Sequence, residues 1–485
     1  MTKRQPSNRI RFRDDRRRSS QVQSRRRLSL EPLEQRRLLA VDFELIDDIN
    51  TSPQSAGPTP SQIVEVGSTM FFLGATPETG TELWKSDGTT AGTEIVASLT
   101  PGTESSQVHS LTNVGGTLFF VNLDADSGRE LWKSDGTAAG TVMVKDIRPG
   151  IGNSNPFRLA NMDGTLYFKA DDGVHGYELW KSDGTAAGTT MVADIHPGTA
   201  SSNLIGLSSL GGSVFFAADD GVHGSELWKT DGTTAGTTMV SDIRSGSTGS
   251  GPIGMTPHNG AIYFRANDGI SGSELWKTDG TAAGTTLVSN IRSGSAGAYP
   301  YTFDSQNGTL FFTANDGTHG TELWKTDGTS GGTVLVADVE PGSASGINSA
   351  LTNVNGTLFF RGRDSVNGQA LWKTNGTTSG TTLVADINPN SPYSGPGELT
   401  NFNGTLYMTA DEGVNGRELW KSDGTTAGTV LVSDINPGSG SSIGSAYLTN
   451  VGGTLYFRAT GGNNVFGLWS SDGTAAGTSE VLGLE

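Results

Sequence analysis

Acidic turns are the residues of this sequence whose types and spacing could do chemistry. An Asp-Gly-Thr unit follows eight of the nine tryptophans, and Asn375-Gly-Thr follows the other. Carboxylate and turn carbonyl oxygens are the ligands that calcium takes, although the spacing of the Asp-Gly-Thr unit is not that of an EF-hand loop. A second acidic turn precedes each Glu-Leu-Trp segment in several copies, and its candidate calcium ligands are Asp172, Asp220, Asp268 and Asp316.

A structural interpretation competes with calcium at both turns. Asp and Asn side chains accept backbone N–H groups in turns, while Gly takes a positive φ at little steric cost. Asn375 stands where the other copies have Asp, which favours this interpretation because a turn accepts either side chain. We therefore expect no resident cofactor, with calcium as the alternative.

The histidines do not form a metal-binding pattern. His175, His223 and His319 share one turn position, five residues before a tryptophan, and Ser271 and Asn415 occupy that position in other copies. A zinc site needs several converging ligands, whereas these residues are spread over separate repeats. The pattern indicates an interchangeable turn position.

Catalysis has no candidate residues in the sequence. An active site must break the symmetry of a repeat, and the irregular segments are 124–129, 361–367 and 388–394. None of them contains a nucleophile with a base or a carboxylate pair in an acid–base setting. Arg361 and Arg363 are the most unusual local charges. We therefore predict a protein that is not an enzyme.

The elements that must position these turns recur along the chain. Successive tryptophans are 48 residues apart seven times and then 49 residues apart. Identical recurrence favours a structural core position over a ligand-binding platform, because a buried Trp side chain contributes a large apolar area. The nine structural tryptophans are Trp84, Trp132, Trp180, Trp228, Trp276, Trp324, Trp372, Trp420 and Trp469.

One well-formed repeat predicts four short antiparallel strands. They are expected at 207–210, 213–218, 225–229 and 237–243, separated by turns rich in Gly, Asp and Thr. The second strand is apolar almost throughout, which predicts burial on both of its faces. Four strands in about 40–50 residues are typical of a β-propeller blade.

Nine repeats predict an all-β propeller with nine four-stranded antiparallel blades. An eight-bladed ring with one divergent repeat, or an open solenoid, is the alternative. Residues 41–50 resemble the fourth strand of a blade, but they come before the first strand of the first repeat. We expect this N-terminal strand to close the ring by joining the last blade, whose own fourth strand is short.

Charge divides the chain into two domains. Residues 1–41 hold 13 basic and four acidic residues, a net charge of +9, and residues 42–485 hold 20 and 46, a net charge of −26. An acidic body repels nucleic acid and anionic lipid. The sequence has no Cys and no apolar run long enough to span a membrane. We expect a monomer.

The basic N-terminal segment resembles a targeting element. Its residues 29–40, Ser-Leu-Glu-Pro-Leu-Glu-Gln-Arg-Arg-Leu-Leu-Ala, are similar to an N-terminal motif of large exported planctomycete proteins. No conventional apolar signal region follows, and a disordered polyanion-binding tail is the other interpretation. The resemblance implies that residues 1–41 are a disordered leader and that the propeller spans residues 42–485.

The repeat itself resembles the bacterial family known by its Glu-Leu-Trp-x-x-Asp-Gly-Thr motif. Seven copies are intact, and two depart, at Ala370–Thr377 and Gly467–Thr474. The resemblance implies a propeller-like architecture and an extracellular or cell-surface location. It implies no reaction.

These observations predict a non-enzymatic exported or cell-surface scaffold for protein or polysaccharide interaction. Loops on one face of a propeller would bind the partner. The alternatives are an extracellular hydrolase or lyase acting on polysaccharide, and a calcium-dependent lectin. Function is expected where the repeat fails.

Overall fold

The computed structural model describes residues 60–76, 79–99, 106–347, 349–393, 395–462 and 465–482. All regular elements in these residues are β-strands, and 36 strands form nine four-stranded sheets, which we call blades 1 to 9 in chain order. The predicted leader and the closing strand expected at 41–50 lie outside the described residues. The described part of the chain has no helix with the length and hydrophobicity that a membrane crossing requires.

The strands of the first five blades have the following bounds. Blades 1 and 2 contain β1 (Ser61–Val66), β2 (Thr69–Thr76), β3 (Gly80–Ser86), β4 (Glu94–Ala97), β5 (His109–Val114), β6 (Thr117–Asp124), β7 (Gly128–Ser134) and β8 (Val142–Lys145). Blades 3 to 5 contain β9 (Phe157–Met162), β10 (Thr165–Asp171), β11 (Tyr177–Ser182), β12 (Thr190–Ala193), β13 (Ile205–Leu210), β14 (Ser213–Asp219), β15 (Ser225–Thr230), β16 (Thr238–Ser241), β17 (Ile253–His258), β18 (Ala261–Asn267), β19 (Ser273–Thr278) and β20 (Thr286–Ser289).

The last four blades follow the same plan. They contain β21 (Tyr301–Gln306), β22 (Thr309–Asn315), β23 (Thr321–Thr326), β24 (Val334–Ala337), β25 (Thr352–Val354), β26 (Thr357–Asp364), β27 (Gly368–Thr374), β28 (Thr382–Ala385), β29 (Gly397–Phe402), β30 (Thr405–Asp411), β31 (Arg417–Ser422), β32 (Val430–Ser433), β33 (Thr449–Val451), β34 (Thr454–Ala459), β35 (Gly467–Ser471) and β36 (Ser479–Leu482).

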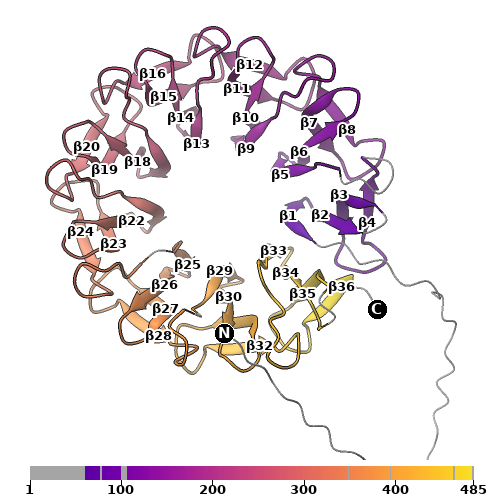
Figure 1. The fold of residues 1–485 in the computed structure, drawn as a ribbon, viewed down its shortest axis with the longest axis vertical. Coiled ribbons are helices and arrows are strands. Elements are labelled where there is room, and N and C mark those ends of the chain that lie inside the picture. The colour runs from indigo at the N-terminus through magenta and orange to yellow at the C-terminus, as the bar shows by residue number, and fades with distance from the viewer. Residues whose placement is uncertain are drawn as a thin grey trace, which may run out of the picture. The chain divides into compact units, whose positions relative to one another are not determined.

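The blades form a nine-bladed β-propeller, as the repeat predicts. Within each blade the strands are antiparallel and follow chain order from first to fourth. The blades stand around a ring, with the first strand nearest the centre and the fourth strand at the periphery (Figure 1). The alternative of eight blades with one repeat left over is wrong, because all nine repeats form a complete sheet.

In blade 4 the predicted strands 213–218 and 225–229 agree with β14 and β15 within one residue. The first strand, β13, starts two residues earlier than predicted, because Gly206 at φ 64° forms a bulge that extends the pairing to Ile205 and Ala217. The fourth strand, β16, is shorter than the predicted 237–243. It ends at Ser241 because the next segment turns inward, where Ile243 N–H donates to Glu226.

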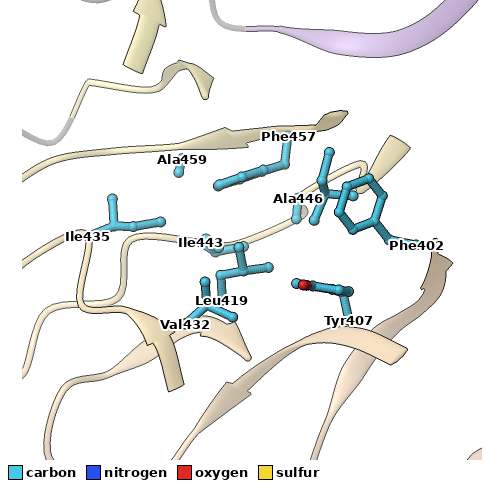
Figure 2. Packing of buried hydrophobic residues seen from close by; sticks show 10 residues of the cluster. Phe402, Tyr407, Leu419, Val432, Ile435, Ile443, Ala446, Phe457 and Ala459 are labelled. Carbon is cyan, nitrogen blue, oxygen red and sulfur yellow. The ribbon is translucent and has the colours of Figure 1, made fainter. Parts of the chain in front are cut away.

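Apolar layers hold neighbouring blades together. Nine clusters of buried residues each combine one face of a blade with the opposite face of the next. Figure 2 shows the cluster between blades 8 and 9, where Tyr407 and Leu419 from blade 8 face Phe457 from blade 9. The second strand of each blade contributes to both of its junctions, and in β14 every residue but the first and last is buried. This confirms the prediction of a strand buried on both faces.

A lysine–glycine hydrogen bond crosses most junctions. Lys229 Nζ in blade 4 donates to the carbonyl of Gly280 in the Asp-Gly-Thr turn of blade 5, at 2.8 Å. Gly280 has φ 90°, and a Cβ there would lie 3.1 Å from the Phe215 ring of blade 4, so the turn requires Gly for two reasons. The other lysines that make this bond are Lys85, Lys133, Lys277, Lys325, Lys373 and Lys421.

Blade 9 packs directly on blade 1 at what we call the closing junction. Phe72 of blade 1 and Leu468 of blade 9 belong to one buried cluster there, and Thr90 Oγ1 donates to the Val481 carbonyl at 2.7 Å. In blade 9 the fourth position is occupied by β36, which pairs with β35. Ser470 stands where the other blades have the linking lysine.

Candidate functional site

The Asp-Gly-Thr units form hydrogen-bonded turns at the start of the connection from third to fourth strand. Asp231 Oδ1 accepts the N–H of Thr233 at 2.8 Å and its hydroxyl at 2.7 Å. These bonds lower the pKa of Asp231. Asn375 accepts the same two groups from Thr377, at 3.1 and 2.7 Å. The turn interpretation is therefore confirmed by an amide that makes the same bonds as the carboxylates.

The four calcium candidates bind donors of their own turns. Asp220 Oδ1 accepts the N–H groups of Val222 and His223 at 2.9 and 2.8 Å, and its Oδ2 lies 2.7 Å from His223 Nδ1. The same pattern recurs at Asp172, Asp268 and Asp316, with Ser271 in place of His beside Asp268. These residues lie in blades 3 to 6, one in each. Within the described ranges no group of three or more acidic or His side chains is arranged to hold a metal ion.

The repeated histidines are partners of these acidic turns. The hydrogen bond that Asp220 accepts from the His223 imidazole raises the pKa of His223, and the equivalent aspartates raise the pKa of His175 and His319. All three imidazoles are partly exposed. They stabilise hairpin tips, which agrees with their interchange with Ser and Asn in the sequence.

Each of the nine tryptophans belongs to one of the nine clusters between blades. Trp84 and Trp180 are buried, and the other seven are partly exposed. The deepest burial falls on the facing residue of the second strand, such as Phe216, which pairs with Trp228 and is fully buried. Trp84 stacks on Phe72 with ring centroids 6.2 Å apart. The tryptophans cover the edge of each layer, and the facing phenylalanine, replaced by Met408 in blade 8, fills its centre.

The glutamate of Glu-Leu-Trp is a buried group whose role the sequence reasoning missed. Glu226 is fully buried, and its carboxylate accepts the N–H groups of Ile243, Arg244 and Ser250 at 3.1, 3.1 and 2.8 Å. The Ser250 hydroxyl donates a fourth bond at 2.6 Å. One side chain thus holds the whole connection from the fourth strand of blade 4 to the first strand of blade 5.

The same arrangement recurs in six other blades. Burial raises the pKa of the carboxyl to about 7, against the lowering effect of the hydrogen bonds, at Glu130, Glu178, Glu274, Glu322 and Glu418. Glu82 accepts the N–H of Leu99 in the same way. A signal was available in the sequence: the position holds Glu in seven copies and otherwise only Ala370 or Gly467, which indicates a buried position.

Blade 7 lacks this glutamate, and its outgoing loop has a different composition and hydrogen bonds within the loop itself. Ala370 is fully buried at the position. The loop that follows β28 contains Pro389, Pro392 and Pro396, which have no N–H to satisfy. Asn388 stabilises the loop locally, since its side-chain oxygen accepts the Asn390 N–H and its carbonyl accepts that of Ser391.

The nine repeats differ from one another most clearly at what we call the inner rim. It consists of the second-strand residue that directly follows the buried Phe or Met of each blade, together with the first-strand residue that pairs with it in the seven blades whose first strand has a bulge. In blade 4 this pair is Ile205 and Ala217, whereas in blade 3 it is Phe157 and Lys169. The second-strand position is otherwise filled by Leu73, Val121, Arg265, Thr313, Arg361, Thr409 and Arg458.

A pocket of about 310 Å³ opens on the inner rim between blades 2 and 3. Arg129 Nη1 donates to Asn155 Oδ1 at 2.9 Å, and Asn155 Nδ2 donates to the Tyr177 hydroxyl at 3.1 Å. Arg129 also donates to Gln107. The lining residues are His109, Arg129, Asn155, Pro156, Phe157, Lys169 and Tyr177.

Positive charge and aromatic rings meet in this pocket. Lys169 Nζ lies 5.2 Å from the centroid of the Tyr177 ring, and the Arg158 guanidinium lies 5.3 Å from that of Phe157. Burial, followed by the charge of Arg158, lowers the pKa of Lys169. The ion pairs of the described residues include none of the three cations Arg129, Arg158 and Lys169.

Two further pockets flank blade 7, where the first strand β25 has three residues and no bulge. One, of about 430 Å³, is lined by Tyr301 and Thr313 of blade 6, among others, and the second, of about 380 Å³, by Arg361 and Glu398. Arg129 and Arg361 come from segments that the sequence marked as irregular. Their positions at separate pockets could not be predicted from those segments alone.

No family model matches the chain, and no curated protein is significantly similar to it. Among solved structures, a puromycin hydrolase is 14% identical with a TM-score of 0.38, over 73% of this chain and 58% of that one. A structure from a study of two prolyl endopeptidases is 12% identical with a TM-score of 0.41, over 73% and 54%. The β-propeller domain of the Trilobed protease from Pyrococcus furiosus is 12% identical with a TM-score of 0.34, over 66% and 96%. The chain thus spans little more than half of the first two.

Proposed function

We propose that this propeller is a non-enzymatic binding scaffold that acts at the cell surface or outside the cell. The observation that carries the proposal is the contrast between the uniform junctions and the variable inner rim. Every ordinary junction repeats the same packing, while the rim positions change from blade to blade and open into pockets. Ligand-binding residues concentrate on variable positions that a rigid scaffold holds in place.

The partner in this proposal is an extracellular protein or polysaccharide, bound by a monomer without a resident cofactor. The export motif in residues 29–40 supports the location, and the resemblance of the repeat to the Glu-Leu-Trp-x-x-Asp-Gly-Thr family supports both location and role. The acidic turns support independence from calcium, because their carboxylate oxygens already accept hydrogen bonds from their own turns.

Binding without turnover is the test of this proposal. The purified chain is titrated with extracellular polysaccharides and secreted proteins, and the recovered ligands are analysed by mass spectrometry. We expect saturable binding and unchanged ligands. Cleavage of a glycan, ester or peptide would overturn the proposal in favour of a hydrolase or lyase.

A thermal-shift series with calcium and with a chelator addresses the lectin alternative. A ligand at one hundred times its dissociation constant adds about 2.7 kcal/mol of stability. We expect no such shift with calcium. A shift of that size, together with ligand binding that the chelator abolishes, would identify a calcium-dependent lectin.

A further inference from the structure

The pocket between blades 2 and 3 differs chemically from the rest of the molecule. Residues 42–485 carry a net charge of −26, yet Arg129 and Lys169 line this pocket with His109, and Arg158 lies over the Phe157 ring of its wall. Burial, followed by the charge of Arg129, lowers the pKa of His109. Cations that converge without a carboxylate partner create a site for an anion.

The aromatic side chains make the pocket selective for a ring. Phe157 is 52% exposed although it is a large apolar residue, and Pro156 lies beside it in the pocket wall. The Tyr177 hydroxyl and the Asn155 side chain place polar groups next to these apolar faces. A ligand that satisfies both kinds of surface has a flat apolar face, hydroxyl groups and a negative charge.

We propose that this pocket binds a carboxylate-bearing sugar, the uronate unit of an acidic polysaccharide. The carboxylate lies against Arg129 and Lys169, the sugar ring packs on Phe157, and the ring hydroxyls bond to Asn155 and Tyr177. This inference rests on the proposed binding function and specifies its ligand class.

Two other polyanions fit the pocket less well. An acidic peptide supplies carboxylates but no ring face or hydroxyl groups for Phe157 and Asn155. A nucleic acid supplies rings, but its negative charge lies on the backbone phosphates and not on the ring that would pack on Phe157.

The other repeats supply substitutions that fit the fold. Ser225 and Ser273 occupy the position of Arg129 in blades 4 and 5, and Ala217 occupies that of Lys169 in blade 4. Arg129→Ser and Lys169→Ala therefore convert the pocket into residues that regular blades already contain. Arg265→Ala, at the position of Lys169 in blade 5, removes one charge elsewhere on the rim and is the matched control.

The experiment is isothermal titration of the full chain with hexagalacturonate at low salt. The neutral hexasaccharide cellohexaose, a poly-glutamate peptide and oligothymidylate are the comparison ligands. We expect hexagalacturonate to bind most tightly, and Arg129→Ser and Lys169→Ala each to weaken it at least tenfold. Arg265→Ala should change the dissociation constant less than twofold. Because the basic residues 1–41 are present in every variant, their affinity for polyanions cancels in this comparison.

Several outcomes would overturn the uronate assignment. They are an unchanged affinity in both pocket variants, an equal loss in Arg265→Ala, absent binding of hexagalacturonate, and tighter binding of the peptide or the oligonucleotide. In each of these cases a protein or neutral polysaccharide that binds elsewhere on the rim would leave the scaffold function intact. Cleavage of hexagalacturonate by the chain would instead overturn the non-enzymatic function, while the affinities of the variants would still decide whether the pocket holds the sugar.

Discussion

The junction between blades 4 and 5 and the closing junction between blades 9 and 1 have similar apolar layers but different polar links. Phe264 fills the first layer and Phe72 the second, and both are fully buried. Only the first junction has a buried glutamate and the lysine–glycine bond, because Gly467 and Ser470 replace Glu and Lys in blade 9. Apolar packing is thus common to the whole ring, whereas these two polar links belong to junctions that the chain itself crosses.

Phe264→Ala and Phe72→Ala should have the largest effects. Removing a buried Phe side chain costs about 3–5 kcal/mol, and the closing junction has neither the buried glutamate nor the lysine–glycine bond to limit the loss. We expect hydrogen exchange to rise at blades 4 and 5 in the first variant and throughout blades 9 and 1 in the second. Because repeat arrays need not unfold in two states, exchange is read blade by blade. Equal, local increases in both variants would show that the closing junction is as strong as the others.

Glu226→Gln should have the next largest effect. The Gln amide presents N–H groups to backbone N–H donors, so bonds to a charged group worth about 1.5–3 kcal/mol are lost. The control is Glu65→Gln at the closing junction, where Glu65 Oε1 accepts only the Gly452 N–H, in exposed surroundings. Its effect should stay within about 0.5 kcal/mol. Urea denaturation measures both, and similar losses would contradict the difference between the junctions.

The pH should also affect the stability of junctions that have a buried glutamate differently from that of the closing junction, which has none. Burial raises the pKa of Glu130, Glu178 and Glu418 to about 7 in the folded state, above the ordinary 4.5. The folded protein therefore binds protons more tightly than the unfolded chain. Protonation of these glutamates stabilises the folded state fully below about pH 4.5, and this contribution is lost as the pH rises through about 7. The raised pKa values of His175 and His223 act in the same direction above their ordinary value of 6.5.

The urea midpoint should therefore be higher at about pH 5 than at about pH 8, at constant ionic strength. Glu418→Gln should reduce the difference, because Gln does not titrate. Protection factors at the closing junction, which correct exchange rates for their intrinsic pH dependence, should respond least to pH, since that junction has no buried glutamate. A midpoint that rises with pH would contradict the assigned direction of the glutamate pKa.

Ser470→Lys should have the smallest effect and the opposite sign. It restores the lysine that donates to the next blade elsewhere, with the Gly88 carbonyl as its acceptor, and a hydrogen bond contributes about 0.5–1.5 kcal/mol. Lys229→Ser, the reciprocal change in blade 4, should lose a similar amount. Slower exchange in blades 9 and 1 of Ser470→Lys is the expected readout. Faster exchange there would show that Gly88 is not an equivalent acceptor.

The repeat predicted the propeller because periodic apolar positions determine strand pairing and burial directly. The roles of Trp228 and of the strand 213–218 follow from that periodicity. The recurrence of Glu at this position could have indicated burial, but the role of Glu226 did not follow from it. Three of its four partners are main-chain N–H groups, which carry no sequence signature, and an isolated glutamate is expected at the surface.

The sequence could not predict the pocket or fix the number of blades, for other reasons. Arg129 and Lys169 come from different repeats and meet only because two blades stand side by side. The number of blades is a property of the closed ring, whereas every local junction uses the same residues. Nine repeats therefore predicted nine blades, with eight as an alternative that no single repeat could exclude.

The lysine–glycine bond also bears on how such a ring could change during evolution. A regular repeat carries both halves of the link: in blade 5, Lys277 is the donor for the blade ahead and Gly280 is the acceptor for the blade behind. A recombination event that duplicates or deletes one whole regular repeat would leave a matching donor and acceptor at the new junction between regular repeats. The ring could then gain or lose a blade, together with its rim residues, in one genetic step, and ligand specificity could evolve without redesign of the core.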